Sequence, residues 1–188
     1  MIEIRWHGRG GQGAKTVALL LADAALAVGK HMQAFPEYGP ERMGAPVQSF
    51  NRISDRPITL HCSVKEPSVV AVLDPTLMAT VNVTGGLKPD GILLVNTALS
   101  PAEIKQQTGF AGTVYTIDAS KISRETIGRD IPNTPMLGAL VKVTGVLDFD
   151  AMVEDTEKKL AKKFSHRPEV IEGNIKSIKR AALEVRAA

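Results

Sequence analysis

The chain has 188 residues, of which 44% are hydrophobic and 23% are charged, as is ordinary for a soluble globular protein. Its 23 Lys and Arg residues against 20 Asp and Glu give a net charge of +3, a balance too even for a nucleic-acid-binding protein. The single cysteine excludes a disulfide framework within the chain and a cysteine-ligated cluster or zinc site. Because the sequence shows neither a signal peptide nor an apolar run of about 18 residues, we expect a cytoplasmic protein that binds neither nucleic acid nor membranes.

The first forty residues read as a strand, a glycine turn, a helix and a second strand. Residues 2–7 form a short apolar opening that enters the glycine-rich stretch HGRGGQGAKT at residues 7–16. From Gln12 to Val28 the apolar residues recur at helical spacing, and Gly29 supplies a stop. The stretch HMQAFPEYG follows at residues 31–39 as the next strand. This order predicts the opening of a right-handed crossover on a parallel sheet.

The pattern then changes to an alternating one. The stretch APVQSFNRIS at residues 45–54 alternates, and a turn leads to ITLHCS at residues 58–63, so we expect an antiparallel hairpin here. Three further strands are predicted in SVVAVLD, GILLVNT and GTVYTID. The first two are continuous apolar runs, typical of parallel strands covered on both faces. They end in Asp74 and Asn96, at the edge where open sheets place their ligands.

Three helices complete the chain, at residues 135–145, 149–164 and 168–185. We therefore expect an α/β fold with a Rossmann-like, mostly parallel sheet, an antiparallel hairpin and a helical C-terminal appendage. Residues 1–188 form a single domain in this interpretation, with residues 146–188 as the appendage.

The glycine loop is the first candidate site. Gly8, Gly10 and Gly13 satisfy the spacing G-x-G-x-x-G after a strand and before a helix. The helix N-terminus offers backbone N–H groups and the positive end of a dipole, which stabilise an anion. The predicted phosphate-binding set is Gly8, Arg9, Gly10, Gly11, Gln12, Gly13, Lys15 and Thr16.

Other interpretations of this loop remain open. A nicotinamide site needs an acidic residue after the second strand, and Glu37 is near enough. A P-loop fails by one residue, because Ala14 precedes Lys15 and Thr16, and no magnesium-binding segment follows. The loop could also be a tight turn that only lets the helix pack closely on the sheet.

A second loop, PEYGPERMGAPV at residues 36–47, is rigid and charged, and a dinucleotide fold does not need it. Its candidate ligand or subunit contacts are Glu37, Tyr38, Gly39, Glu41 and Arg42; the alternative is a solvated surface turn. We expect His7 to be a hydrogen-bonded core histidine. Cys62 is expected to be a buried small hydrophobic residue. No catalytic grouping or metal cluster is evident in the sequence.

Taken in order, these motifs resemble a known family. The sequence resembles the gamma subunit of the 2-oxoacid:ferredoxin oxidoreductases. The segments that carry the resemblance are HGRGGQGAKT, PEYGPERMGAPVQSFNRIS, LDPTLM, NTPMLGALVKVTGVLD and VIEGNIKSIKRAALEV. The segment YGPERMGAPV is similar to the pyruvate-type, or pyruvate synthase, gamma chain. Gamma chains for 2-oxoisovalerate or 2-oxoglutarate are alternatives. Two further alternatives lie outside the family: a stand-alone NAD-dependent oxidoreductase and a purely structural scaffold.

The resemblance implies a subunit of a heteromultimer and no complete enzyme. The assembly converts pyruvate, coenzyme A and oxidised ferredoxin to acetyl-CoA, carbon dioxide and reduced ferredoxin. Thiamine diphosphate and iron–sulfur clusters are expected in the partner alpha, beta and delta subunits, with none carried by this chain and ferredoxin met only indirectly. Coenzyme A is a substrate, and the resemblance implies that the glycine loop helps to bind it.

Overall fold

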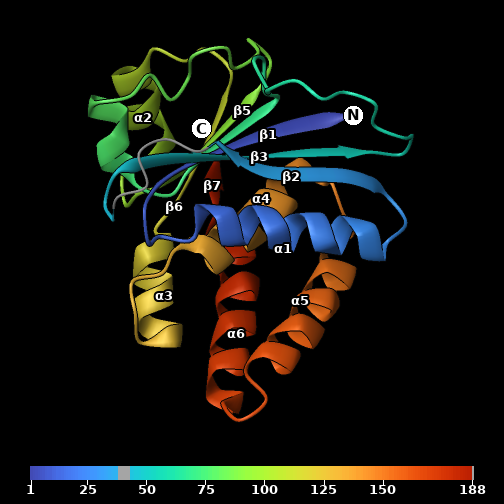
Figure 1. The fold of residues 1–188 in the computed structure, drawn as a ribbon. Coiled ribbons are helices and arrows are strands. Elements are labelled where there is room, and N and C mark those ends of the chain that lie inside the picture. Colours follow the sequence, from blue (N-terminus) through green and yellow to red (C-terminus); the bar gives the residue numbers. More distant parts are fainter. Residues whose placement is uncertain (38–42, 188) are drawn as a thin grey trace.

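The computed structural model describes residues 1–37 and 43–187 (Figure 1). Its strands are β1 (Ile2–Arg9), β2 (His31–Glu37), β3 (Pro46–Ser54), β4 (Val69–Val72), β5 (Ile92–Asn96), β6 (Thr113–Ile117) and β7 (Arg186–Ala187). Its helices are α1 (Ala14–Ala27), the short 3₁₀ helix η1 (Pro75–Ala79), α2 (Pro101–Thr108), α3 (Ala119–Ile127), α4 (Asn133–Thr144), α5 (Phe149–Lys163) and α6 (Pro168–Glu184).

All these strands belong to one mixed sheet in the order β2-β3-β1-β4-β5-β6-β7. Strands β1, β4, β5 and β6 run parallel, as the continuous apolar runs predicted. β3 is antiparallel to both of its neighbours, β1 and β2, and the two-residue β7 is antiparallel to β6. The predicted α/β class with a mostly parallel sheet is confirmed.

The hairpin was assigned to the wrong partner. β3 pairs with β2 and with β1, whereas residues 58–63 contain no strand. β3 is therefore an interior strand, and its residues 50–53 are buried. Asn51 suits this position because its amide accepts a hydrogen bond from the indole nitrogen of Trp6 and donates one to the carbonyl of Ala18.

The first two strands, which were predicted to be joined by a crossover, are separated in the sheet by β3. β2 runs in the same direction as β1, but β3 lies between them. Alternating sequence identifies a strand without naming its neighbour, so the insertion could not be inferred from the pattern.

Helices cover both faces of the sheet. The larger core joins one face to α1, α4, α5 and α6, and it contains Trp6, Leu21, Leu140 and Ile178, all with less than 1% exposure. The smaller core lies on the opposite face beneath η1 and α2. Figure 1 shows α1 running along the sheet while α5 and α6 extend away from it.

The predicted C-terminal helices are found as α4, α5 and α6, each within two residues of the expected bounds. α4 and α6 meet with backbone against backbone, because a Cβ on Gly138 would lie 2.3 Å from the carbonyl oxygen of Ile178. The helices α2 and α3 were not predicted. Together these elements bring the glycine loop and the second loop to one edge of the sheet.

Candidate functional site

The glycine loop joins the end of β1 to the start of α1. Gly11 and Gly13 have φ angles of +97° and +83°, a left-handed conformation that L side chains rarely adopt. A Cβ on Gly8 would lie 3.1 Å from the Leu73 side chain, so this glycine permits close packing of β1 on its neighbour. The glycine pattern therefore combines two requirements: a positive φ angle at Gly11 and Gly13, and space for close packing at Gly8.

Arg9 and Gln12 are held by the carboxylate of Asp74, which follows the neighbouring strand β4 and caps η1. Oδ2 of Asp74 accepts hydrogen bonds from Nε of Arg9 at 3.1 Å and from Nε2 of Gln12 at 2.7 Å. Oδ1 accepts from the backbone N–H and the hydroxyl of Thr76, at 2.9 and 2.6 Å. Burial alone would raise the Asp74 pKa, but these hydrogen bonds and the Arg9 charge together lower it. Asp74 is therefore a carboxylate that fixes the glycine loop.

The end of the second loop pairs with the glycine loop. The N–H of Gly10 donates to the carbonyl of Ala45 at 2.9 Å, and the N–H of Gly44 donates to the carbonyl of Gly10 at 3.1 Å. Arg9 also donates to the carbonyl of Gly44. The two loops therefore form one unit.

Of the predicted second-loop contacts, Glu37 is described: it ends β2 and is exposed. Tyr38, Gly39, Glu41 and Arg42 lie outside the described residues.

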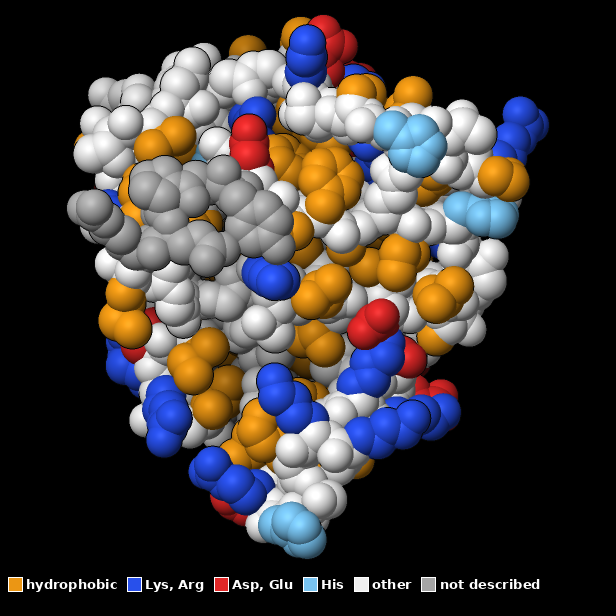
Figure 2. All heavy atoms as spheres, in the orientation of Figure 1, with side chains coloured by type: hydrophobic (Ala, Val, Ile, Leu, Met, Phe, Trp, Pro, Cys, Tyr) orange, Lys and Arg blue, Asp and Glu red, His pale blue; other side chains and the backbone are white. Residues whose placement is uncertain are grey.

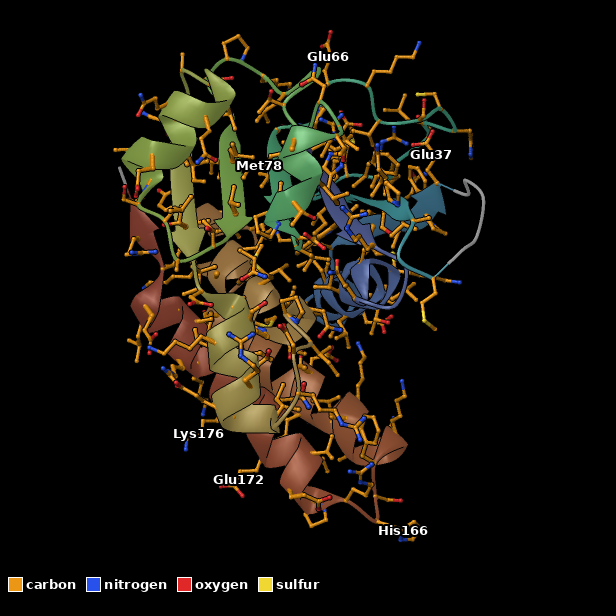
Figure 3. The ribbon with its side chains drawn as sticks, turned by 90° about the vertical axis from the view of Figure 1, so that its left-hand side faces the viewer. Glu37, Glu66, Met78, His166, Glu172 and Lys176 are labelled. Atoms are coloured by element: carbon orange, nitrogen blue, oxygen red, sulfur yellow. The ribbon has the colours of Figure 1, made fainter. Side chains whose placement is uncertain are left out.

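A pocket of about 520 Å³ opens beside the two loops, and we call it the loop pocket. Its described lining comprises Arg9, Gly10, Gly11, Gly13, Ala14, Lys15, Thr16, Pro36, Glu37, Met43, Val47, Gln48 and Ser49. Figure 3 views the molecule close to the axis of α1 and labels Glu37 at the end of β2. Most of the predicted phosphate-binding set, including Lys15 and Thr16, is thus brought to one cavity; Gly8 and Gln12 stand behind it, in the packing and the Asp74 network.

The electrostatics of the loop pocket favour an anion. Gly13 is the N-cap of α1 and provides no side-chain cap, and the first turn of the helix contains no acidic residue. Lys15 lies in that turn and lines the pocket, so its cation adds to the positive potential of the helix N-terminus. Backbone N–H groups at such a terminus bind phosphate or carboxylate groups.

His7 and Cys62 depart from what was expected. His7 is buried, as predicted, but its Nε2 has no hydrogen-bond partner within the described residues. Burial, aided by the Arg5 charge, lowers the His7 pKa to about 4, so the imidazole is neutral. Cys62 is exposed, so its predicted burial was wrong. The segment that carries it is a surface coil beside β3 instead of a strand in the sheet.

The Asn96 amide accepts from the N–H of Ser120 and donates to the carbonyl of Leu73, so it joins α3 to the sheet. Within residues 1–37 and 43–187 no group of three or more His, Cys, Asp or Glu side chains could hold a metal ion. In the same residues no helix has the length and hydrophobicity needed to cross a membrane.

Fold and site together define a Rossmann-like α/β protein with a glycine loop at a helix N-terminus and no evident catalytic group among the described residues. More specifically, the chain belongs to the pyruvate ferredoxin/flavodoxin oxidoreductase family, whose model matches residues 3–184. Relatives from three organisms illustrate the similarity.

The pyruvate synthase subunit PorC of Thermotoga maritima is 49% identical over 186 residues, covering 99% of this chain and 95% of that protein. The crystal structure of the T. maritima pyruvate oxidoreductase subunit PORC matches with a TM-score of 0.87 and 47% identity, over 100% of this chain and 98% of that one. The common gamma subunit of the pyruvate and ketoisovalerate oxidoreductases of Pyrococcus abyssi is 49% identical, covering 83% of this chain and 86% of that protein.

A 2-oxoglutarate:ferredoxin oxidoreductase from Magnetococcus marinus, whose structure contains coenzyme A, shares the fold with a TM-score of 0.76 at 21% identity, over 97% of this chain and 30% of that one. The predicted relationship to pyruvate-type gamma subunits is confirmed.

Proposed function

We propose that this chain is the gamma subunit of a multisubunit pyruvate:ferredoxin oxidoreductase and supplies part of its coenzyme A site. In this proposal thiamine diphosphate and the iron–sulfur clusters reside in the alpha, beta and delta subunits, and electrons reach ferredoxin through them. The chain itself binds and orients coenzyme A in the cytoplasm. Its similarity to PorC of T. maritima over nearly the full length of both proteins supports the assignment as a subunit.

One observation supports the coenzyme A site above the others. The positive end of α1 opens into the loop pocket together with Lys15, and coenzyme A carries a pyrophosphate and a 3′-phosphate. Among the residues that the structure describes, the pocket offers binding groups but no nucleophile paired with a base. It therefore suits a chain that holds a substrate while its partners perform the chemistry.

The alternative of an NAD-dependent enzyme is disfavoured by the sheet order. A nicotinamide site uses an acidic residue on the strand adjacent to β1 to bind the ribose. Here β3 occupies that position, so Glu37 on β2 lies two strand spacings, or about 10 Å, from β1. Tight NADH binding by the purified chain would overturn the proposed function.

Replacing Lys15 tests the coenzyme A site. In the assembled complex, Lys15→Ala should raise the Michaelis constant for coenzyme A about tenfold, because charge-assisted contacts to phosphate contribute roughly 1.5–3 kcal/mol. The constant for pyruvate should change little. Lys88→Ala is a matched control, since Lys88 is exposed in the loop before β5, far from the glycine loop in the sequence. A change in the pyruvate constant with none for coenzyme A would contradict the proposal.

The relative from P. abyssi raises a second candidate. Its gamma subunit is named as common to pyruvate and ketoisovalerate oxidoreductases. If this chain also serves two assemblies, the choice of 2-oxoacid rests with the partner subunits. Measuring the assembled complex with pyruvate and with 2-oxoisovalerate, using one gamma chain and alternative partners, decides between a dedicated and a shared subunit.

A further inference from the structure

A broad groove runs along the outer side of α6, and we call it the α6 groove. It has a volume of about 810 Å³ and shares no residue with the loop pocket. Figure 3 shows Glu172 and Lys176 pointing outward from α6, on the side away from α1. The lining of the groove comprises Glu157, Pro168, Ile171, Glu172, Ile175, Lys176, Lys179, Arg180 and Leu183.

The α6 groove leaves apolar surface in water. Of the large hydrophobic side chains on the described helices, that of Leu183 is the most exposed, at 86%. Pro168 is also exposed, while Ile171 and Ile175 form a more deeply set floor. A single exposed leucine needs no explanation, but a row of apolar residues along one groove marks an interaction surface.

The charges of the α6 groove are of both signs and are not used within the chain. Arg180 forms ion pairs with two glutamates of this chain. Glu172, Lys176 and Lys179 are exposed, and they form no ion pair among the described residues. The groove therefore offers both a negative and a positive charge to whatever lies against it.

The arrangement of these residues is symmetric about one point of α6. Glu172 and Lys179 lie equally far from that point, on its two sides. Pro168 and Leu183 also lie equally far from it, nearer the ends of the helix. With 3.6 residues per turn, all four positions share one face. A two-fold axis through this point places acid against base and apolar against apolar, twice each.

The opposite side of the helical layer lacks this symmetry of charge. Figure 2 shows Lys and Arg side chains spread around hydrophobic ones over α3, α5 and α6 on the side that faces α1. The cleft on that side is lined by four cations and one acid, namely Arg129, Lys159, Lys163, Arg167 and Asp23. Two copies that met there would bring like charges together, whereas two copies that met at the α6 groove would not.

We propose that the α6 groove is an interface between two copies of this chain, with each α6 antiparallel to its counterpart. Glu172 of one copy pairs with Lys179 of the other, and Pro168 packs against Leu183. A crossing angle of about 20°, which is common for antiparallel helices, keeps these pairs in contact along α6, whose 17 residues span about 26 Å. Near the axis Ile175 meets its own counterpart, and the long Lys176 side chains extend into water at the rim.

This contact is independent of the proposed coenzyme A site. The loop pocket and the α6 groove have no lining residue in common, so the pocket stays open when two copies associate. The contact would join two assemblies through their gamma chains. Its failure would leave the proposed function standing, and the reverse is also true.

A charge swap tests the contact directly. Sedimentation of the full-length chain over a range of concentrations should show a monomer–dimer equilibrium. Because the two-fold axis repeats the pair, Glu172→Lys replaces two attractions by two repulsions, so the dimer dissociation constant should rise about tenfold or more. Lys179→Glu should do the same. The double variant that carries both changes should restore the dimer, because each acid again faces a base.

Two further variants separate the contact from general effects. Glu66→Lys makes the same change of net charge at an exposed position away from α6 and should dimerise as the parent does. Leu183→Gln should weaken the dimer without lowering the free energy of unfolding, because this side chain is already in water in the monomer. Leu26→Gln is its control, since Leu26 is 62% exposed at the end of α1.

Three results would overturn the inference. The first is a parent chain that stays monomeric up to about 1 mM, where even a weak contact populates the dimer. The second is a double variant that dissociates as readily as the single ones. The third is an equal effect of Glu66→Lys and Glu172→Lys. A monomeric chain that binds a partner subunit through Glu172 and Lys179 would assign the groove to that subunit instead.

Discussion

Replacing Asp74 should loosen the glycine loop measurably. The Asp74→Ala variant removes a carboxylate that accepts hydrogen bonds from Arg9, Gln12 and the backbone and hydroxyl of Thr76. Hydrogen bonds to a charged group contribute about 1.5–3 kcal/mol each, but they are not additive. Arg9 is 30% exposed, so water can replace part of what it loses. We expect the free energy of unfolding to fall by about 3 kcal/mol.

The isosteric variant Asp74→Asn refines the expectation. An amide has one acceptor oxygen, so it can accept the hydrogen bonds from Thr76 or those from Arg9 and Gln12, but not both sets. Its NH₂ group then faces the donors that have lost their acceptor. The loss should be intermediate, about 1.5 kcal/mol. Asp130→Ala is the control, because Asp130 is half exposed and its ion pair with Arg124 contributes about 0.5 kcal/mol.

Urea unfolding followed by tryptophan fluorescence provides the assay. Trp6 is the single tryptophan of the chain and is fully buried against Asn51, so its emission reports loss of the core. A loss in Asp74→Ala no greater than in Asp130→Ala would refute the idea that this carboxylate holds the loop. In the assembled complex the same variant should raise the Michaelis constant for coenzyme A more than it lowers kcat.

The other predictions use the same assays. Gly13→Ala should destabilise more than Gly109→Ala: both positions have positive φ, but only at Gly13 does the new Cβ meet a neighbour, Nδ2 of Asn133 at 2.6 Å. The free energy of unfolding should fall as the pH drops from 6.5 toward 4. In this range His7 binds a proton in the unfolded chain but stays neutral in the folded protein, where its pKa is lowered. The difference between a pKa of 6.5 in the unfolded chain and about 4 in the folded one corresponds to about 3 kcal/mol, and His7→Gln should flatten this part of the profile. The isolated chain should not oxidise pyruvate with coenzyme A and a viologen dye, whereas adding the partner subunits should restore activity.

Local sequence signals found most elements, and the two missed helices carried signals of their own. α2 begins with a capping box in which Ser100 and Glu103 exchange side-chain and backbone hydrogen bonds, with Pro101 at its first position. α3 is capped by Asp118 and ends at Gly128. Both could have been predicted from spacing alone, because a cap involves residues within one turn of each other.

Contacts between distant segments could not be predicted in the same way. Asp74 was identified only as a polar residue at a strand end, yet it holds side chains 62 and 65 residues earlier in the chain. The amide of Asn133 reaches the α1 N-terminus only because α4 packs beside α1. Sequence patterns locate the glycine loop, whereas packing decides which side chains support it.

The inserted strand β3 explains why the surroundings of the glycine loop differ from those of the glycine loop in a dinucleotide-binding fold. With β3 between β1 and β2, the start of β3 lies at the edge where the glycine loop lies, since Pro46 pairs with Arg9. The residues just before Pro46 therefore reach Gly10 and exchange backbone hydrogen bonds with it. A dinucleotide fold leaves that edge open for the ribose. Here backbone from the second loop, at Gly44 and Ala45, lies against the glycine loop. A ligand bound at the start of α1, where we propose that an anion binds, is therefore coupled to the loop beside it.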